Sequence, residues 1–302
     1  MAWQQLHIQC KKSQAEIAET LLLEADALSI SLDDAGDQPL FEPLPGESPL
    51  WDNVIVSALF DTSVNLENIS QSIANQVIAT RVWQSCVDDK DWEREWMKNY
   101  YPIECANNLW ITPKWLTPPK PDALNIMMDP GLAFGTGYHA TTRLCIDWLT
   151  EQDLTDKIVL DYGCGSGILG IVALKRGAKA VYAVDIDPQA LLATQQNAKC
   201  NGVLNQLQVF LPQAFEQFCQ NNPNLCIQMI VANILAKPLI ALAPYFSTLI
   251  EPKGDIVLAG LIENQVADVK TAYQAFFDMH NDFAFSSQED KHWHRLSGKK
   301  SR

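Results

Sequence analysis

The 302-residue sequence is poor in basic residues. It holds 22 lysines and arginines against 36 aspartates and glutamates, which gives a formal net charge of −14. A surface with this excess of negative charge repels phosphate backbones, so we expect no autonomous binding of nucleic acid. The same charge would attract a basic partner, although it is equally compatible with a role in solubility alone.

Disulfide, metal and membrane motifs are also missing. The eight cysteines are scattered without C-x-x-C spacing, and the five histidines complete no zinc pattern. Such cysteines are typical of reduced core residues, so we expect a cytoplasmic protein without a metal. The N-terminus lacks the basic-then-apolar order of a signal peptide. The most apolar stretch, 227–250, is interrupted by Asn233, Lys237 and two prolines, which argues against a membrane span.

The first 88 residues alternate between strand and helix patterns. Ser13 and Glu16 form a capping-box signature ahead of a first helix, and apolar residues recur at helical spacing again between 66 and 77. The resulting order β-α-β-β-α-β predicts a ferredoxin-like α+β domain over residues 1–88. Its four strands are expected at 3–9, 27–32, 54–60 and 82–87.

A change of pattern separates this domain from the rest of the chain. Residues 89–101, DKDWEREWMKNYY, are charged and aromatic without an apolar face, and we expect a helical linker. Trp92 and Trp96 are one helical turn apart, so they can pack together on a neighbouring surface. Five prolines between 102 and 121 then exclude a regular helix.

From about residue 155 onward, strands and helices alternate. This alternation predicts an α/β domain over 102–302, with a Rossmann-like, doubly wound sheet and helices on both faces. The strands are expected at 157–163, 180–187, 207–210, 227–235, 254–261, 283–288 and 292–297, and the helices at 168–177, 188–202, 238–246 and 264–277.

The strongest local signal is VLDYGCGSGILG, at 159–170. Gly163, Gly165 and Gly167 form a turn between a strand that ends at Asp161 and a helix that starts at once. Glycines are needed in such a turn because a side chain would hold a ligand away from the backbone. The helix N-terminus also directs N–H groups at whatever binds there.

Two classes of cofactor fit this loop. The spacing G-x-G-x-x-G that ends at Gly170 satisfies the dinucleotide fingerprint of nicotinamide dehydrogenases. The spacing D-x-G-x-G-x-G that begins at Asp161 is that of class I methyltransferases, which use S-adenosyl-L-methionine. In both interpretations Asp185, at the end of the second strand, accepts hydrogen bonds from ribose hydroxyls. Asp187 is a weaker candidate because it can simply cap the next helix.

Two further segments discriminate between these classes. Asn233 leaves a buried strand at the carboxyl edge of the sheet, where its amide can accept a hydrogen bond from a substrate amine. The second is MMDPGLAFGTGYHATT at 127–142, hereafter the lead-in segment. It carries three glycines and opens into a threonine-rich helix start, so it can close over a ligand.

Taken together, DPGLAFGTGYHATT, LDYGCGSGILGI, AVDIDPQAL and VANIL resemble the PrmA family, the methyltransferases of ribosomal protein L11. The lead-in segment is the most specific part, since generic class I methyltransferases share the glycine loop but not this segment. The chain departs from the usual Thr-His-Pro triplet of the family at Tyr138, His139 and Ala140.

The resemblance implies transfer of methyl groups from S-adenosyl-L-methionine to lysine ε-amines and the N-terminal α-amine of ribosomal protein L11, up to three times on one nitrogen. It also implies that the small N-terminal domain recognises this basic substrate and that a mobile linker lets the catalytic domain reach several sites. The resemblance implies that four residues contact the cofactor: Thr142, Gly163, Asp185 and Asn233. It also implies that the same pocket is lined by Phe134 and Thr136. The glycine loop contributes Gly165 as a further cofactor-binding residue.

Methyl transfer to an amine requires the neutral amine, and a lysine starts with a pKa of about 10.4. No His/Asp or Glu/Glu pair in the sequence indicates a general base. We therefore expect Asn233, as the catalytic residue, to orient the nitrogen while solvent takes the proton. His139 is expected to pack or cap. We expect a monomer. A methyltransferase for another protein or a small-molecule amine, an NAD-dependent dehydrogenase and a non-catalytic binding module remain as alternatives.

Overall fold

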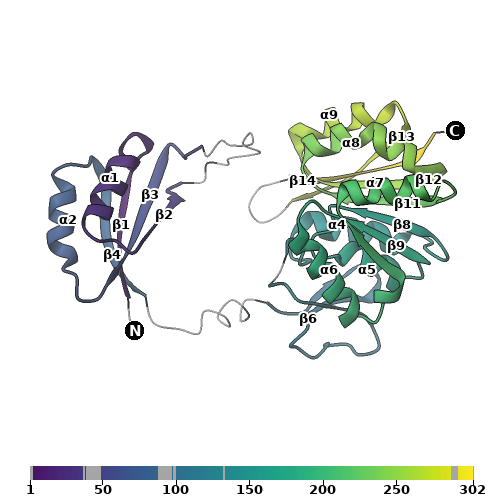
Figure 1. Cartoon of the computed structure of the whole chain (residues 1–302), viewed down its shortest axis with the longest axis horizontal. Coiled ribbons are helices and arrows are strands. Elements are labelled where there is room, and N and C mark those ends of the chain that lie inside the picture. Colours follow the sequence, from purple (N-terminus) through teal and green to yellow (C-terminus); the bar gives the residue numbers. More distant parts are fainter. Residues whose placement is uncertain are drawn as a thin grey trace. The chain divides into compact units, whose positions relative to one another are not determined.

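The computed structural model describes residues 3–36, 38, 49–87, 97, 100–131, 133–286 and 292–301. The chain forms two compact units, Met1–Asn99 and Tyr100–Arg302, which Figure 1 shows coloured along the sequence. Most of the predicted linker over 89–101, including Trp92 and Trp96, lies outside the described residues. The expected helix there stays a prediction.

The N-terminal unit is built around one four-stranded sheet of order β2-β3-β1-β4. All of its strand pairs are antiparallel, which confirms the ferredoxin-like α+β fold. Apolar side chains from alternate positions of the strands, such as Leu6, Val56 and Phe60, form its core with the two helices. The elements are β1 (Trp3–Lys11), α1 (Lys12–Glu24), β2 (Ser29–Asp34), β3 (Asn53–Asp61), α2 (Leu66–Ala74) and β4 (Ala79–Val87).

The predicted capping box at the start of α1 is wrong. The helix begins at Lys12, so Ser13 lies inside it, and the N-cap residue Lys11 makes no side-chain cap. The first turn is held instead by tertiary contacts, since Lys12 N–H donates to the carbonyl of Asp52 at 3.2 Å. The second helix does have a side-chain cap, because Asn65 accepts from the backbone N–H groups of Glu67 and Asn68.

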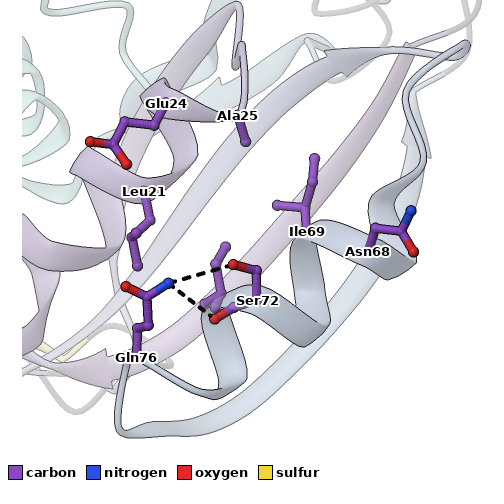
Figure 2. A pocket seen from close by; sticks show the side chains of 8 residues that line it. Leu21, Glu24, Ala25, Asn68, Ile69, Ser72 and Gln76 are labelled. Carbon is purple, nitrogen blue, oxygen red and sulfur yellow. Dashed lines mark hydrogen bonds between the residues drawn. The ribbon is translucent and has the colours of Figure 1, made fainter.

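A shallow pocket lies between α1 and α2, and Figure 2 shows the side chains that line it. Leu21, Ile69 and Ile73 supply apolar surface, while Gln76 Nε2 lies 3.5 Å from both Ser72 Oγ and the Ser72 carbonyl. Glu24 is the only charged side chain in the lining. The pocket therefore lacks an acid–base pair that could activate the Ser72 hydroxyl, and it is not a candidate reaction site.

The C-terminal unit contains a seven-stranded sheet of order β10-β9-β8-β11-β12-β14-β13. The five strands from β10 to β12 are parallel, and β14 and β13 are antiparallel to their neighbours. This is the predicted doubly wound sheet. The strands are β8 (Ile158–Tyr162), β9 (Ala180–Val184), β10 (Leu207–Phe210), β11 (Ile227–Asn233), β12 (Ile250–Ile262), β13 (Phe277–Ser286) and β14 (His292–Lys300).

Helices cover both faces of this sheet, as Figure 1 shows, and each face has its own apolar core. On one face lie α4 (Ala140–Glu151), α5 (Ile168–Lys175) and α6 (Pro188–Cys200), which contribute residues such as Ile146 and Val172. On the other lie α7 (Pro212–Asn221), α8 (Ala236–Leu249) and α9 (Glu263–Gln274). The carboxyl ends of the parallel strands are thereby left as the edge where a ligand can bind.

Several elements differ from the prediction. The proline-rich segment before the main sheet forms a three-stranded sheet of β5 (Ile103–Cys105), β6 (Leu109–Pro113) and β7 (Leu124–Met128), with a 3-10 turn at Ala106–Asn108. Helix α7 is an additional element between the third and fourth strands. Strand β13 begins at Phe277 rather than at 283, because the preceding helix already ends at Gln274. No helix among the described residues is long and apolar enough to cross a membrane.

Candidate active site

The glycine loop lies between β8 and α5, at the carboxyl edge of the sheet. Its glycines at 163, 165 and 167 all have positive φ, a region that L-residues with side chains rarely adopt. A Cβ added to Gly165 would lie 2.6 Å from the carbonyl oxygen of Phe134. Gly165 is therefore required by the protein's own packing, in addition to any ligand, because the lead-in segment passes directly over it.

Asp185 follows β9 and binds the glycine loop. Its Oδ2 accepts from the backbone N–H of Gly165 at 2.8 Å, and its Oδ1 accepts from the N–H of Asp187 at 3.0 Å. Each carboxylate oxygen has a further lone pair, so the side chain can still accept from two hydroxyls. Asp187 caps α6 by accepting from Gln189 N–H at 2.9 Å, which supports the capping interpretation.

Asp161 is the most deeply buried carboxyl group of the site, with 1% of its surface exposed. Its Oδ2 accepts from Gly170 N–H at 2.9 Å, while its Oδ1 has no hydrogen-bond partner among the described residues. Burial raises the pKa of Asp161 to about 7, against the effect of the Gly170 bond, and the charge of Asp185 raises it further. The carboxyl is thus poised between its neutral and charged forms near neutral pH.

The lead-in segment is attached to the glycine loop through Ser166. The Ser166 N–H donates to the carbonyl of Phe134 at 2.8 Å, and its hydroxyl donates to the carbonyl of Gly135 at 2.6 Å. The Phe134 side chain is 97% exposed, so the backbone of this residue is fixed while its ring faces solvent. Thr136, two positions further along, is partly buried. Both residues are thereby held beside the glycine loop.

Asn233 and Thr142 are 91 positions apart in sequence and meet in the structure. Asn233 is the last residue of β11, and its Nδ2 donates to Thr142 Oγ1 on α4 at 3.3 Å. This leaves Asn233 Oδ1 as an acceptor, which suits an amine. Gly260 in β12 provides the space, since a Cβ there would lie 2.5 Å from the Ile234 carbonyl and 3.3 Å from Asn233 Oδ1.

The remaining lead-in residues have structural partners. His139 is the N-cap of α4, where its Nδ1 accepts from Thr141 N–H at 3.3 Å, and its ring packs edge-on against Trp293 at 4.6 Å. This confirms the expectation that it packs or caps. The Tyr138 hydroxyl binds both backbone polar groups of Tyr101: it accepts from the N–H at 2.7 Å and donates to the carbonyl. Tyr138 thus ties the lead-in segment to the beginning of the C-terminal unit.

The structure places the predicted residues in two groups and shows which other residues hold them in position. Gly165 is hydrogen-bonded to Asp185, with Gly163 in the same loop, and Asn233 is hydrogen-bonded to Thr142. Phe134 and Thr136 lie on the segment that covers the first group. The supporting residues Ser166, Asn197, Gly260 and Tyr138 were not predicted.

A signal in the sequence could have found one of these supports. Asn197 continues the helical stripe of Ala190, Ala193 and Thr194, all buried, so its polar side chain had to find partners inside the protein.

The arrangement fits a cofactor with ribose-like hydroxyls. The backbone N–H groups of residues 163–168 already donate within the protein, so the remaining lone pairs of Asp185 are the acceptors that suit such hydroxyls. The unpartnered Oδ1 of Asp161 is buried inside the protein. No group of His, Cys, Asp or Glu among the described residues could hold a metal ion.

The chain is similar to known proteins over nearly its whole length. Residues 2–301 match the family model described as Ribosomal protein L11 methyltransferase (PrmA). The chain is 68% identical over 304 aligned residues to the Ribosomal protein L11 methyltransferase of Psychrobacter arcticus, and 49% identical to that of Acinetobacter baumannii (strain AYE), with 99% of each chain covered. A crystal structure of a ribosomal protein L11 methylase from Lactobacillus delbrueckii subsp. bulgaricus is 29% identical, with a TM-score of 0.56; the likeness covers 67% of this chain and 100% of that one.

The family model and the two relatives match both units of the chain, including the N-terminal unit, which has no sharp motif of its own. They remove the dehydrogenase and the non-catalytic module as alternatives. The chain belongs to the ribosomal protein L11 methyltransferase (PrmA) family, and its cofactor is S-adenosyl-L-methionine.

Proposed function

We propose that the chain transfers methyl groups to lysine ε-amines and to the N-terminal α-amine of ribosomal protein L11, up to trimethylation of one nitrogen. The observation that carries this proposal is the acceptor oxygen of Asn233 at the carboxyl edge of the sheet, beside Thr142 and the glycine loop. The full-length similarity to proteins named for L11 methylation supports the identity of the substrate.

When bound, S-adenosyl-L-methionine supplies an electrophilic methyl group on a sulfonium. We propose that Asp185 accepts hydrogen bonds from its ribose hydroxyls and that Gly163 and Gly165 allow close approach to the loop backbone. Thr142 and Asn233 form the wall nearest the substrate, with Phe134 and Thr136 on the covering segment. In this arrangement the protein acts by positioning its reactants and excluding water, which can lower a barrier substantially without acid–base chemistry.

In this proposal, Asn233 binds and orients the substrate amine. Its Nδ2 is engaged by Thr142, so its Oδ1 is the atom available to accept an N–H of a neutral amine and aim the nitrogen lone pair. Asp161 is buried and His139 uses Nδ1 in the helix cap. We therefore propose that solvent, rather than a side chain, takes the proton from the ammonium form.

The N-terminal unit is proposed to recognise the substrate protein. Residues 1–99 contain 6 basic and 17 acidic residues, a net charge of −11, whereas residues 100–302 contain 16 and 19, a net charge of −3. Most of the negative charge thus belongs to the smaller unit, which suits attraction of a basic ribosomal protein. A linker over 89–101 and a monomeric state complete the proposal.

Incubation with purified ribosomal protein L11 and isotopically labelled S-adenosyl-L-methionine tests this function. We expect mass increments of one to three methyl groups at lysines and at the N-terminus, located by peptide mass spectrometry. The Asn233→Ala variant, with its cofactor binding measured in parallel by calorimetry, is the matched control. If the wild-type protein binds cofactor but leaves L11 unmodified, the substrate is another protein or a small-molecule amine.

A further inference from the structure

Two buried amide side chains, Asn197 in helix α6 and Asn201 at its C-cap, have no role in the proposed chemistry. Asn197 is 1% exposed and Asn201 is 9% exposed, and they lie one turn apart on the face of the helix that packs inward. A buried amide is costly unless its donor and acceptor groups are satisfied. Their partners therefore show what these side chains hold in place.

Asn197 joins two segments that are distant in sequence. Its Nδ2 donates to the carbonyl of Ser166 in the glycine loop at 2.9 Å, and its Oδ1 accepts from the N–H of Asp129 in the lead-in segment at 2.9 Å. One rigid amide plane thus sets the distance between the two segments. Ser166 makes the second attachment, through its bonds to Phe134 and Gly135.

Asn201 makes a comparable set of hydrogen bonds, but to different parts of the chain. Its Oδ1 accepts from Met127 N–H at 2.8 Å, and its Nδ2 donates to the carbonyls of Met127 and Asn197 at 2.7 and 2.8 Å. It holds the end of β7 against α6 and makes no contact with the glycine loop in these bonds. The two asparagines are therefore a natural matched pair of equal chemistry.

We propose that Asn197 is a positioning residue for cofactor binding: it fixes the lead-in segment at its working distance from the glycine loop before the cofactor arrives. Without this bridge, the lead-in segment keeps its bonds to Ser166 but the loop loses one of its anchors on α6. Binding must then order both walls, and the cost of that ordering reduces affinity. The inference rests on the proposed function only in taking this pocket as the cofactor site.

The test compares Asn197→Asp with Asn201→Asp. The aspartate can keep the acceptor for the Asp129 or Met127 N–H group, and it replaces the N–H donor by an oxygen that faces a carbonyl. We expect both variants to lose some thermal stability. Only Asn197→Asp should weaken S-adenosyl-L-methionine binding in calorimetry, by about tenfold, with Asn201→Asp within about twofold of wild type.

Two further readouts separate positioning from a general structural defect. In the cofactor-free protein, amide hydrogen exchange over 129–136, which excludes the Met127 N–H bound by Asn201, should be faster in Asn197→Asp than in Asn201→Asp. In turnover, the KM for the cofactor should rise while kcat at saturating cofactor stays within about threefold. Equal losses of affinity in the two variants, or unchanged exchange, would overturn the role of Asn197. Failure of the wild-type protein to bind the cofactor would instead overturn the cofactor site itself.

Discussion

Replacing Asp185 tests whether this carboxylate holds the cofactor or only the glycine loop. Its two oxygens accept from the backbone N–H groups of Gly165 and Asp187, and we propose that their remaining lone pairs accept from ribose hydroxyls. A hydrogen bond to a charged group contributes about 1.5–3 kcal/mol. Asp185→Ala should therefore weaken S-adenosyl-L-methionine binding about 10- to 100-fold.

The same substitution has a cost in the cofactor-free protein, because Gly165 N–H loses its partner. A loss of about 1.5 kcal/mol corresponds to a fall in Tm of about 3–6 °C for a domain of roughly 200 residues. Asp187→Asn is the matched control: it removes a neighbouring charge, yet asparagine caps α6 as well as aspartate does. The cofactor affinity and the Tm of Asp187→Asn should both stay near the wild-type values.

Isothermal calorimetry and thermal unfolding measure the two effects of Asp185 separately. A Kd within about twofold of wild type, together with a lowered Tm, would show that Asp185 serves the loop alone. An equal loss of affinity in Asp185→Ala and Asp187→Asn would show that the cofactor responds to the general charge of this edge rather than to bonds from one side chain.

Four other predictions concern the amine, the substrate and the buried carboxyl. Asn233→Ala should lower kcat about 100-fold and change cofactor affinity little, because it misorients the amine; equal losses in kinetics and calorimetry would make it a cofactor residue only. If solvent takes the proton, lowering the pH from 9 to 7 should raise the preference for the N-terminal α-amine over lysines about 14-fold, from ordinary pKa values of about 7.8 and 10.4, and a constant ratio of products in mass spectrometry would indicate a protein base. The KM for L11 should rise several-fold between about 0.05 and 0.5 M salt, since screening weakens attraction to the acidic N-terminal unit, and a flat response would refute electrostatic capture. Because burial raises the pKa of Asp161 to about 7, the folded chain keeps a proton that the unfolded chain releases near pH 4. The free energy of unfolding should therefore fall as the pH rises from 4 to 7. Urea titrations of Asp161→Asn should show a weaker dependence of this free energy on pH.

Elements with strong periodicity could be predicted from the sequence, and those with weak periodicity could not. Strands such as β1 and β9 are apolar on their buried positions, so their type and order are read directly. Helix α7 buries only Phe215 completely, and its remaining sequence is rich in glutamine, which hides its amphipathic face. Pro212 at its first turn was the signal that remained. The strands β5 to β7 are short and bordered by prolines, so they resembled a connecting loop.

The candidate site divides in the same way. The glycine loop and Asp185 are local patterns with fixed spacing, so the sequence places them together. The pairing of Asn233 with Thr142, and the attachment of Ser166 to Phe134, depend on contacts between segments that only the tertiary fold brings together. Gly165 shows the limit of a motif. Its spacing indicates a ligand, yet the structure gives it a second constraint in the Phe134 carbonyl. Gly165→Val would therefore disturb the lead-in segment as well as the cofactor, and it cannot test the ligand alone.

The uneven charge of the chain also bears on the chemistry. A carboxylate within about 4–6 Å of a lysine favours the charged ammonium and raises its pKa, which would slow methyl transfer to the neutral amine. Negative charge thus attracts a basic protein, but near the reacting amine it opposes the activation of that protein's lysines. The proposed division of roles would meet both, because residues 1–99 carry a net charge of −11 and residues 100–302 only −3. Within the catalytic unit, the side chain proposed to meet the amine is the neutral Asn233. We infer that substrate capture and amine activation are assigned to separate units because one surface could not perform both.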